Sequence, residues 1–168
     1  MKEDTMREAK TPPRDTSEIK AKLRSYGELQ RRIDLLITRL ENHMETIDTL
    51  PTPNYSGMPS GSHDGTTKAE RYVERKDELE QKIDRMIQQE KELRKEVEDM
   101  IALLSDPDEQ TALEMRYIDG LNWWEVTVAL WGSCEDYDEH EKRYLKRTFR
   151  IHGEALQRLA AVFQPKTS

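Results

Sequence analysis

Two long stretches of the chain carry residues at alternating spacings of four and three, most of them apolar. In residues 17–50 the spacing runs through Ile19, Leu23, Tyr26, Gln30, Ile33, Ile37, Leu40, Met44 and Ile47. In residues 67–104 it runs through Ala69, Tyr72, Lys76, Leu79, Ile83, Met86, Glu90, Leu93, Val97, Met100 and Leu104. Heptads sustained this long indicate helices that pack against other helices. At 1.5 Å per residue the helices would be roughly 50 and 57 Å long, and their similar lengths predict an antiparallel hairpin.

Additional apolar residues widen both stripes, so a hairpin alone would leave apolar surface uncovered. The residues that we expect to pair the helices and to support assembly are Ile33, Ile37, Leu40, Ile83, Met86 and Ile87. Gln30, Lys76 and Glu90 interrupt the seams, and such polar residues can fix register and oligomeric state. We therefore expect a homo-oligomer, a dimer or a tetramer. In the alternative reading, the hairpin packs against its own C-terminal domain.

Two segments are predicted to lack regular structure. The loop at residues 51–66 is rich in proline, glycine and serine, which have low helix propensity. It is longer than a tight hairpin needs, and such loops are often functional or disordered. Residues 1–16, with Pro12 and Pro13, are predicted to be a disordered tail.

Residues 105–164 are predicted to form a small helical domain. Asp119-Gly120 is a turn signal between two apolar-periodic segments, and Asn122 with Glu125 has the spacing of a capping box. Gly132 is expected to end this second helix in a left-handed conformation. The order of helix, turn, short helix, break and basic helix is a helix-turn-helix layout. The residues expected to fill its core are Trp123, in preference to Trp124, with Val126, Leu130 and Phe149.

The last helix combines an apolar stripe with a cluster of cations. The candidate DNA-binding residues are Lys142, Arg143, Lys146, Arg147, Arg150 and His152. A helix that reads the major groove needs one face to anchor it in its domain and another to meet phosphates and base edges. A solvated basic helix with no ligand would show the same pattern.

Charge is segregated along the chain, whose formal net charge is −7. Residues 142–158 contain six Lys and Arg and one Glu, whereas residues 106–141 contain eleven acidic residues and one basic residue, Arg116. An acidic protein can still bind DNA at a defined site if its cations are gathered on one face. The net negative charge argues against a protein that coats nucleic acid regardless of sequence.

Residues 113–159 resemble region 4 of sigma-70 factors, and more closely the phage transcriptional regulators of the ArpU/RinA type. The elements that carry the resemblance are Arg116-Tyr117-Ile118-Asp119-Gly120, Trp124-Glu125 and Arg150-Ile151-His152-Gly153, followed by Ala155-Leu156. The resemblance implies binding to double-stranded DNA and control of phage late genes together with host RNA polymerase. Residues 133–143 depart from the pattern as an insertion where a tight turn is usual, and its acidic part, residues 133–141, has no assigned role.

The residues give no support for an enzyme, a cofactor or a metal site. No Gly-rich phosphate loop, H-E-x-x-H or C-x-x-C motif is present. Cys134, Asp136, Asp138 and His140 lie close in sequence but lack the ligand set of a structural zinc site. The single cysteine suits a reducing cytosol, and no apolar run approaches the length of a membrane span. We therefore expect a protein of the bacterial host cytoplasm.

The sequence thus predicts an all-α protein: a long antiparallel helical hairpin of coiled-coil type over residues 17–104, then a helix-turn-helix domain over residues 105–164. The expected function is that of a sequence-specific DNA-binding transcription regulator. Two alternatives stay open. One is a small terminase subunit that recognises packaging DNA, which a ring-sized assembly would favour. The other is a coiled-coil adaptor that binds proteins, which indifference to DNA would favour.

Overall fold

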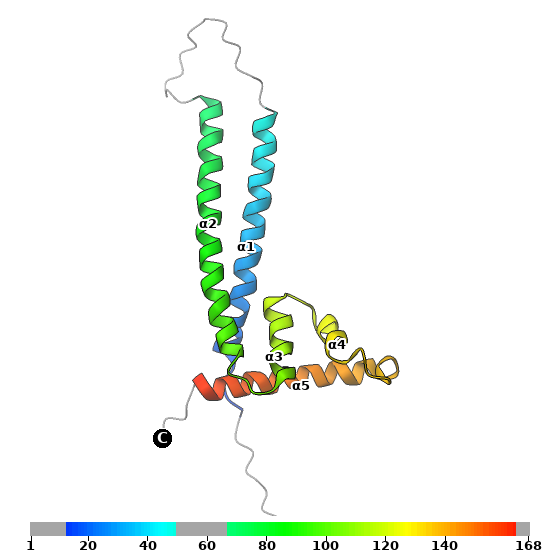
Figure 1. Ribbon diagram of the computed structural model, residues 1–168. Coiled ribbons are helices and arrows are strands. Elements are labelled where there is room, and N and C mark those ends of the chain that lie inside the picture. The colour runs from blue at the N-terminus through cyan, green and yellow to red at the C-terminus, as the bar shows by residue number, and fades with distance from the viewer. Residues whose placement is uncertain (1–12, 50–66, 164–168) are drawn as a thin grey trace, which may run out of the picture. The chain divides into compact units, whose positions relative to one another are not determined.

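A computed structural model describes residues 13–49 and 67–163 of the chain. All regular structure in this part is helical, and a long helix pair precedes the smaller helices, which confirms the predicted all-α class (Figure 1). The elements are α1 (Ser17–Asp48), α2 (Lys68–Ile101), α3 (Pro107–Leu113), the π-helical turn η1 (Glu114–Ile118), α4 (Trp123–Trp131) and α5 (Tyr137–Phe163). The chain forms two compact units: unit 1 comprises Met1–Arg24 and Val97–Ser168, and unit 2 comprises Ser25–Glu96.

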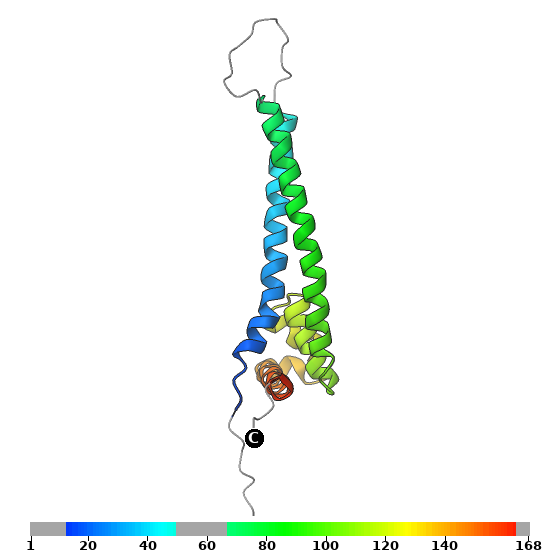
Figure 2. The same ribbon diagram turned by 90° about the vertical axis from the view of Figure 1, so that its left-hand side faces the viewer.

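In unit 2, α1 and α2 run side by side as an antiparallel hairpin, as Figures 1 and 2 both show. Contacts at two levels fix the direction. The Tyr26 hydroxyl donates to the Glu90 carboxylate, while His43 Nε2 lies 2.7 Å from the Tyr72 carbonyl oxygen and the two rings stack. Early residues of α1 thus meet late residues of α2. The predicted loop at residues 51–66 lies outside the described residues.

Local capping explains where the long helices begin. At the start of α1, the Ser17 backbone N–H donates to the Asp15 carboxylate at 2.9 Å. At the start of α2, Thr67 and Glu70 form a reciprocal pair of side-chain to backbone hydrogen bonds. Each bond satisfies a backbone N–H that has no partner within the first helical turn.

The hairpin buries a single narrow seam. The hydrophobic residues buried in unit 2 are Tyr26, Ile33, Leu79, Ile83 and Met86. Leu40 and Ile87 are half-buried, and Ile37 retains 37% of its exposure, so the expected packing of Ile37 in the seam is only partial. The polar interruptions are joined to one another: Gln30 Nε2 donates to the Tyr26 hydroxyl, which donates to Glu90. Burial, together with the Glu90 carboxylate, raises the pKa of Tyr26 to about 12.

In unit 1, α3 and α4 pack on the same side of the long helix α5 (Figure 1). The Asp106 side chain caps α3, which has Pro107 at its first position, where a missing N–H costs nothing. Asn122 and Glu125 form the predicted capping box at α4. Between these helices the backbone widens into η1 and then turns at Gly120, whose φ of +73° is readily adopted only by glycine.

The core between these helices contains a different tryptophan from the one expected. Its buried members are Ala112, Val126, Trp131, Tyr137, Tyr144 and Ile151. Trp131 is 8% exposed, whereas Trp123 is half-buried and Phe149 is 44% exposed. Trp123 and Phe149 do touch edge to face, with ring centroids 5.3 Å apart, but they lie at the margin of the core. Leu130 packs against the core without being fully buried.

The segment taken as an insertion is mostly helical. A short turn over residues 132–136 follows α4, and α5 begins at Tyr137, with a kink at His140 where φ is −129°. Gly132 does not adopt the left-handed conformation that we predicted, because its φ is −61°. A side chain there would place Cβ 2.6 Å from the Val128 carbonyl oxygen, so glycine is required by the close backbone approach.

The start of the described chain is attached to α5. Arg14 N donates to Gln157 Oε1 at 2.8 Å, and Gln157 Nε2 donates back to the Arg14 carbonyl oxygen at 3.0 Å. Residues 13–16 of the predicted disordered tail are therefore held in place by paired hydrogen bonds, a feature that proline content could not predict. Residues 1–12 lie outside the described residues.

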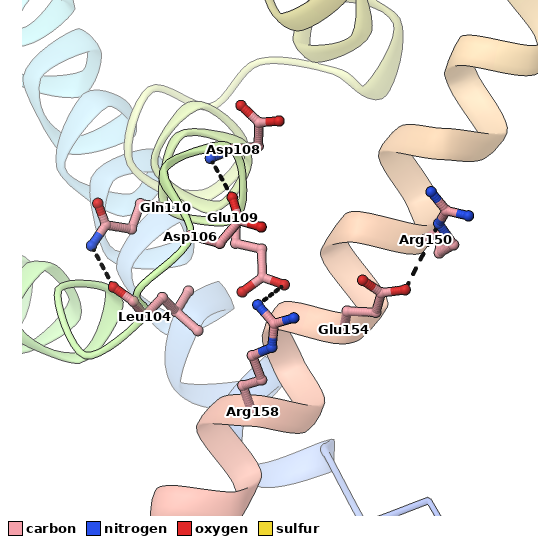
Figure 3. Close-up of polar contacts among 8 residues, drawn as sticks. All are labelled: Leu104, Asp106, Asp108, Glu109, Gln110, Arg150, Glu154 and Arg158. Carbon is pink, nitrogen blue, oxygen red and sulfur yellow. Dashed lines mark hydrogen bonds and ion pairs between the residues drawn. The ribbon is translucent and has the colours of Figure 1, made fainter.

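One charged side chain is buried between α3 and α5. Glu109 is 1% exposed, and its Oε1 lies 2.7 Å from Arg158 Nη1, as Figure 3 shows. Burial raises the pKa of Glu109, and the Arg158 guanidinium opposes that rise. This ion pair links α3 to the C-terminal half of α5. The helices α3, α4 and α5 together form a small three-helix bundle.

Candidate functional site

Five of the six candidate DNA-binding residues share the solvent-exposed side of α5. Lys142, Arg143, Lys146, Arg147 and Arg150 are all exposed. The opposite side of the helix carries its buried residues, which include Tyr144, Thr148, Ile151 and Ala155. The helical period of 3.6 residues separates the two sets, because positions three and four apart fall on the same side. The predicted division of α5 into a core face and a cationic face is therefore present.

The cations surround a shallow recess. Arg143, Tyr144, Lys146, Arg147 and Arg150 line a hollow of about 370 Å³ on the surface of α5. Four of these five side chains are positively charged at neutral pH. Such a hollow suits an anionic group, since guanidinium and ammonium groups donate charge-assisted hydrogen bonds to phosphate oxygens.

The cations differ in how firmly they are held. The Arg147 guanidinium lies 4.0 Å from the centre of the Trp131 ring, in a cation–π contact. Arg150 Nε lies 3.7 Å from Glu154 Oε1, and both of these side chains are exposed (Figure 3). Within residues 13–49 and 67–163, no carboxylate forms an ion pair with Lys142, Arg143, Lys146 or Arg147. These four charges are available to an external anion.

A buried hydrogen-bond network supports the cationic face from beneath. It consists of Thr127, Trp131 and Thr148, none of which our sequence interpretation assigned to the site. Trp131 Nε1 donates to the Thr148 hydroxyl at 3.2 Å, and the Thr127 hydroxyl oxygen lies 3.0 Å from that of Thr148. Thr148 in turn donates to the Tyr144 carbonyl oxygen at 3.1 Å. A threonine within the otherwise apolar run of α4 is the signal that could have indicated this buried network, since buried hydroxyls need partners.

The acidic turn before the cations is also tied to α5. The Tyr144 hydroxyl donates to Asp136, and this hydrogen bond lowers the pKa of the Asp136 carboxyl. The same bond raises the pKa of Tyr144 to about 12. Arg143 lies near enough to Asp136 to stabilise its charge further. The turn thus places a carboxylate beside the first cations of the basic face.

His152, the sixth candidate, lies among aromatic rings on the inner side of α5. Its Nε2 is 3.0 Å from the Tyr117 hydroxyl, and its ring meets the Trp123 ring edge to face at 4.6 Å. Burial lowers the pKa of His152 to about 4, with Lys20, Arg116 and Arg24 adding to the shift. The ring is therefore neutral at pH 7 and packs as part of the domain, separate from the exposed cations.

The described residues offer little for metal chemistry. Across residues 13–49 and 67–163, no three His, Cys, Asp or Glu side chains cluster closely enough to hold a metal ion. Cys134 is half-buried, with its thiol free, at the edge of the α4–α5 core. None of the described helices combines the length and the apolar character that crossing a membrane requires.

Residues 66–146 match the model of a family described as Protein of unknown function (DUF1492), whose members are phage-associated. The match covers α2, α3, η1, α4 and the beginning of α5, and it ends at Lys146 within the cationic face. No curated protein matches the chain. No solved structure matches it either.

Proposed function

We propose that this protein is a sequence-specific DNA-binding transcription regulator whose α5 enters the major groove. The observation that carries the proposal is the exposed cationic face of α5, formed by Lys142, Arg143, Lys146, Arg147 and Arg150 over a packed core. α4 and the turn before α5 would then complete a helix-turn-helix. The family match supports a phage setting, and control of phage late genes together with host RNA polymerase is part of the proposal.

Assembly through unit 2 is the second part of the proposal. A single helix-turn-helix makes few base contacts, so such domains usually bind paired half-sites as dimers. The hairpin leaves apolar side chains partly uncovered: Ile37 is 37% exposed, Met44 43% and Val73 49%. Two copies that bury these residues against each other would present two cationic helices to one stretch of DNA.

This function can be tested by fluorescence anisotropy. The DNA fragments would come from the intergenic regions of the phage or prophage that encodes the protein. The informative variant is Lys142→Ala with Lys146→Ala, which removes two exposed charges of α5. Its control is Lys91→Ala with Lys95→Ala, which removes the same charge from exposed positions of α2. Losing two phosphate contacts should reduce the slope of log affinity against log salt by about 1.8. Equal affinity of the α5 variant, the control and the unmodified protein would refute the proposal.

A protein-binding adaptor is the second candidate, and one observation favours it. Trp124 and Val128 lie one turn apart on α4 and are 42% and 43% exposed, although both are large and apolar. Exposed apolar residues that cluster can mark an interaction surface. Absence of salt-dependent DNA binding in the anisotropy experiment would favour this candidate, and an effect confined to the α5 variant would exclude it as the main function.

A further inference from the structure

Trp131 is fixed in one orientation by buried partners. The side chain is 8% exposed, and its Nε1 donates to the Thr148 hydroxyl, which is fully buried. The Tyr144 ring stacks against it, with centroids 5.9 Å apart. Because an indole with its only donor satisfied and one face packed has little freedom to reorient, the ring is a fixed platform at the edge of the cationic face.

Arg147 rests on this platform. Its guanidinium carbon is 4.0 Å from the Trp131 ring centre, while the side chain remains exposed. A guanidinium that stacks on a ring uses its flat face, so the N–H groups at its edge stay free to donate. The stacking also reduces the rotamer freedom that an arginine would otherwise lose on binding.

The other cations of the face have no such support. Among the described residues, no aromatic ring lies under Arg143 or Arg150, and Arg150 has only a long contact of 3.7 Å with the exposed Glu154. Lys142 and Lys146 carry compact charges on flexible stems. Flexible cations suit phosphates, which tolerate variable geometry. A bidentate contact with a base instead needs the planar guanidinium held in a defined place.

We propose that Arg147 is the specificity-determining residue of the face and reads a guanine through bidentate donation to O6 and N7. Trp131 is the positioning residue, and the Thr148 hydroxyl holds it in register. Lys142, Arg143, Lys146 and Arg150 contact phosphates. This inference rests on the proposed function, because it assigns what the same site recognises in DNA.

Selection of binding sites from a randomised duplex library tests the guanine assignment. Arg147→Lys keeps the charge but removes the planar guanidinium that donates to two base atoms at once. Arg85→Lys, at an exposed position of α2 outside the cationic face, is the matched control. We expect Arg147→Lys to lower the preference for a G·C pair at one position about tenfold or more, with the salt slope unchanged. Arg85→Lys should keep both the preference and the slope.

The role of Trp131 is tested through Thr148. Thr148→Val removes the hydroxyl that accepts from Trp131, and Thr148→Ser retains it. We expect Thr148→Val to reduce the guanine preference severalfold while affinity for unrelated DNA stays the same, and we expect Thr148→Ser to preserve both. Equal loss of both affinities in Thr148→Val would mean a purely structural role and would overturn the positioning claim.

A measurement without DNA complements the selection experiment. In the NMR spectrum of the free full-length protein, the Arg147 side-chain protons should be shifted upfield by the Trp131 ring, and Thr148→Val should reduce that shift. Ordinary chemical shifts for these protons in the unmodified protein would contradict the stacking of Arg147 on Trp131.

The outcomes separate this inference from the proposed function. If the unmodified protein selects no sequence from the library, both are overturned. If it selects a sequence and Arg147→Lys selects the same one equally well, Arg147 is a phosphate contact. In that case the guanine assignment fails while the DNA-binding function stands.

Discussion

The hairpin of unit 2 and the three-helix bundle of unit 1 are both helical, but they hold together in different ways. The hairpin buries one seam, in which Ile33 and Ile83 are 7% and 6% exposed, and a polar group centred on Tyr26 interrupts it. The bundle encloses its core from three helices, with Val126, Thr127 and Thr148 at 0% exposure. Two helices can cover each other on one side only, whereas three can surround an interior.

That difference bears on where the proposed assembly would form. A fully enclosed core needs no further surface, so the bundle can hold the cationic side of α5 rigidly. The hairpin has apolar edges at Ile37, Met44 and Val73, where contact with another chain would add burial. The following predictions test this contrast, in order of decreasing expected effect.

Removal of Trp131 should disrupt the bundle and spare the hairpin. Truncation of a buried tryptophan to alanine typically costs about 3–5 kcal/mol, and here it also removes the hydrogen bond from Trp131 Nε1 to the Thr148 hydroxyl. Trp131→Ala should therefore abolish the near-ultraviolet circular dichroism signal of the bundle while most helical signal persists. Trp124→Ala is the matched control, because that side chain is 42% exposed and its loss should cost less than about 0.5 kcal/mol. Similar melting of both variants would contradict the assigned core.

Charges placed in and beside the seam should act differently. Ile83→Glu puts a carboxylate at a position that is 6% exposed and should lower the free energy of unfolding of the hairpin by about 2–3 kcal/mol. Ile37→Glu, at 37% exposure, should leave the hairpin helical and instead weaken assembly. Circular dichroism and light scattering on both variants check the pair of outcomes. An unmodified protein that is monomeric at micromolar concentration would refute assembly.

Loss of Arg158 should leave a buried carboxylate uncompensated. Arg158→Ala should lower the free energy of unfolding at pH 7 by about 2 kcal/mol, less than for a fully buried pair because Arg158 is half-exposed. The Glu109 pKa is already raised, so the carboxyl can take up a proton as pH falls, and the cost should shrink towards pH 4. Chemical denaturation at both pH values measures this change. In a Glu109→Gln background the same substitution should have little effect at either pH, and an undiminished cost there would exclude the ion pair as its cause.

Acid should destabilise the bundle through His152. Its pKa falls from the ordinary 6.5 to about 4 in the folded protein, so between these values the unfolded chain binds more protons. The stabilisation that the neutral ring gives the folded protein is complete above pH 6.5 and is lost as pH falls towards 4. The expected loss in the free energy of unfolding is about 2 kcal/mol, because the half-buried ring keeps some contact with solvent. His152→Gln cannot titrate, so the difference between its pH profile and that of the unmodified protein isolates this contribution. Parallel profiles would show that the ring is not buried as described.

The sequence alone determined where the long helices lie in the chain and which face of α5 is exposed. Heptad spacing predicted helices at 17–50 and 67–104, which lie close to the observed Ser17–Asp48 and Lys68–Ile101. The Asn122 and Glu125 capping box was predicted as well, because a cap depends on residues three apart. The exposed cations of α5 follow from periodicity in the same way, since a strongly charged face cannot be buried unpaired.

Only the tertiary structure decided which neighbours meet. Periodicity could not choose among Trp123, Trp124 and Trp131, because the choice depends on how α5 crosses α4. It could not place His152 beside Tyr117, bury Glu109 against Arg158 or set Arg147 on Trp131, since each partner lies on another helix. Sequence patterns fix the direction of a side chain relative to its own helix. What that side chain touches is set by packing between helices, which local spacing does not encode.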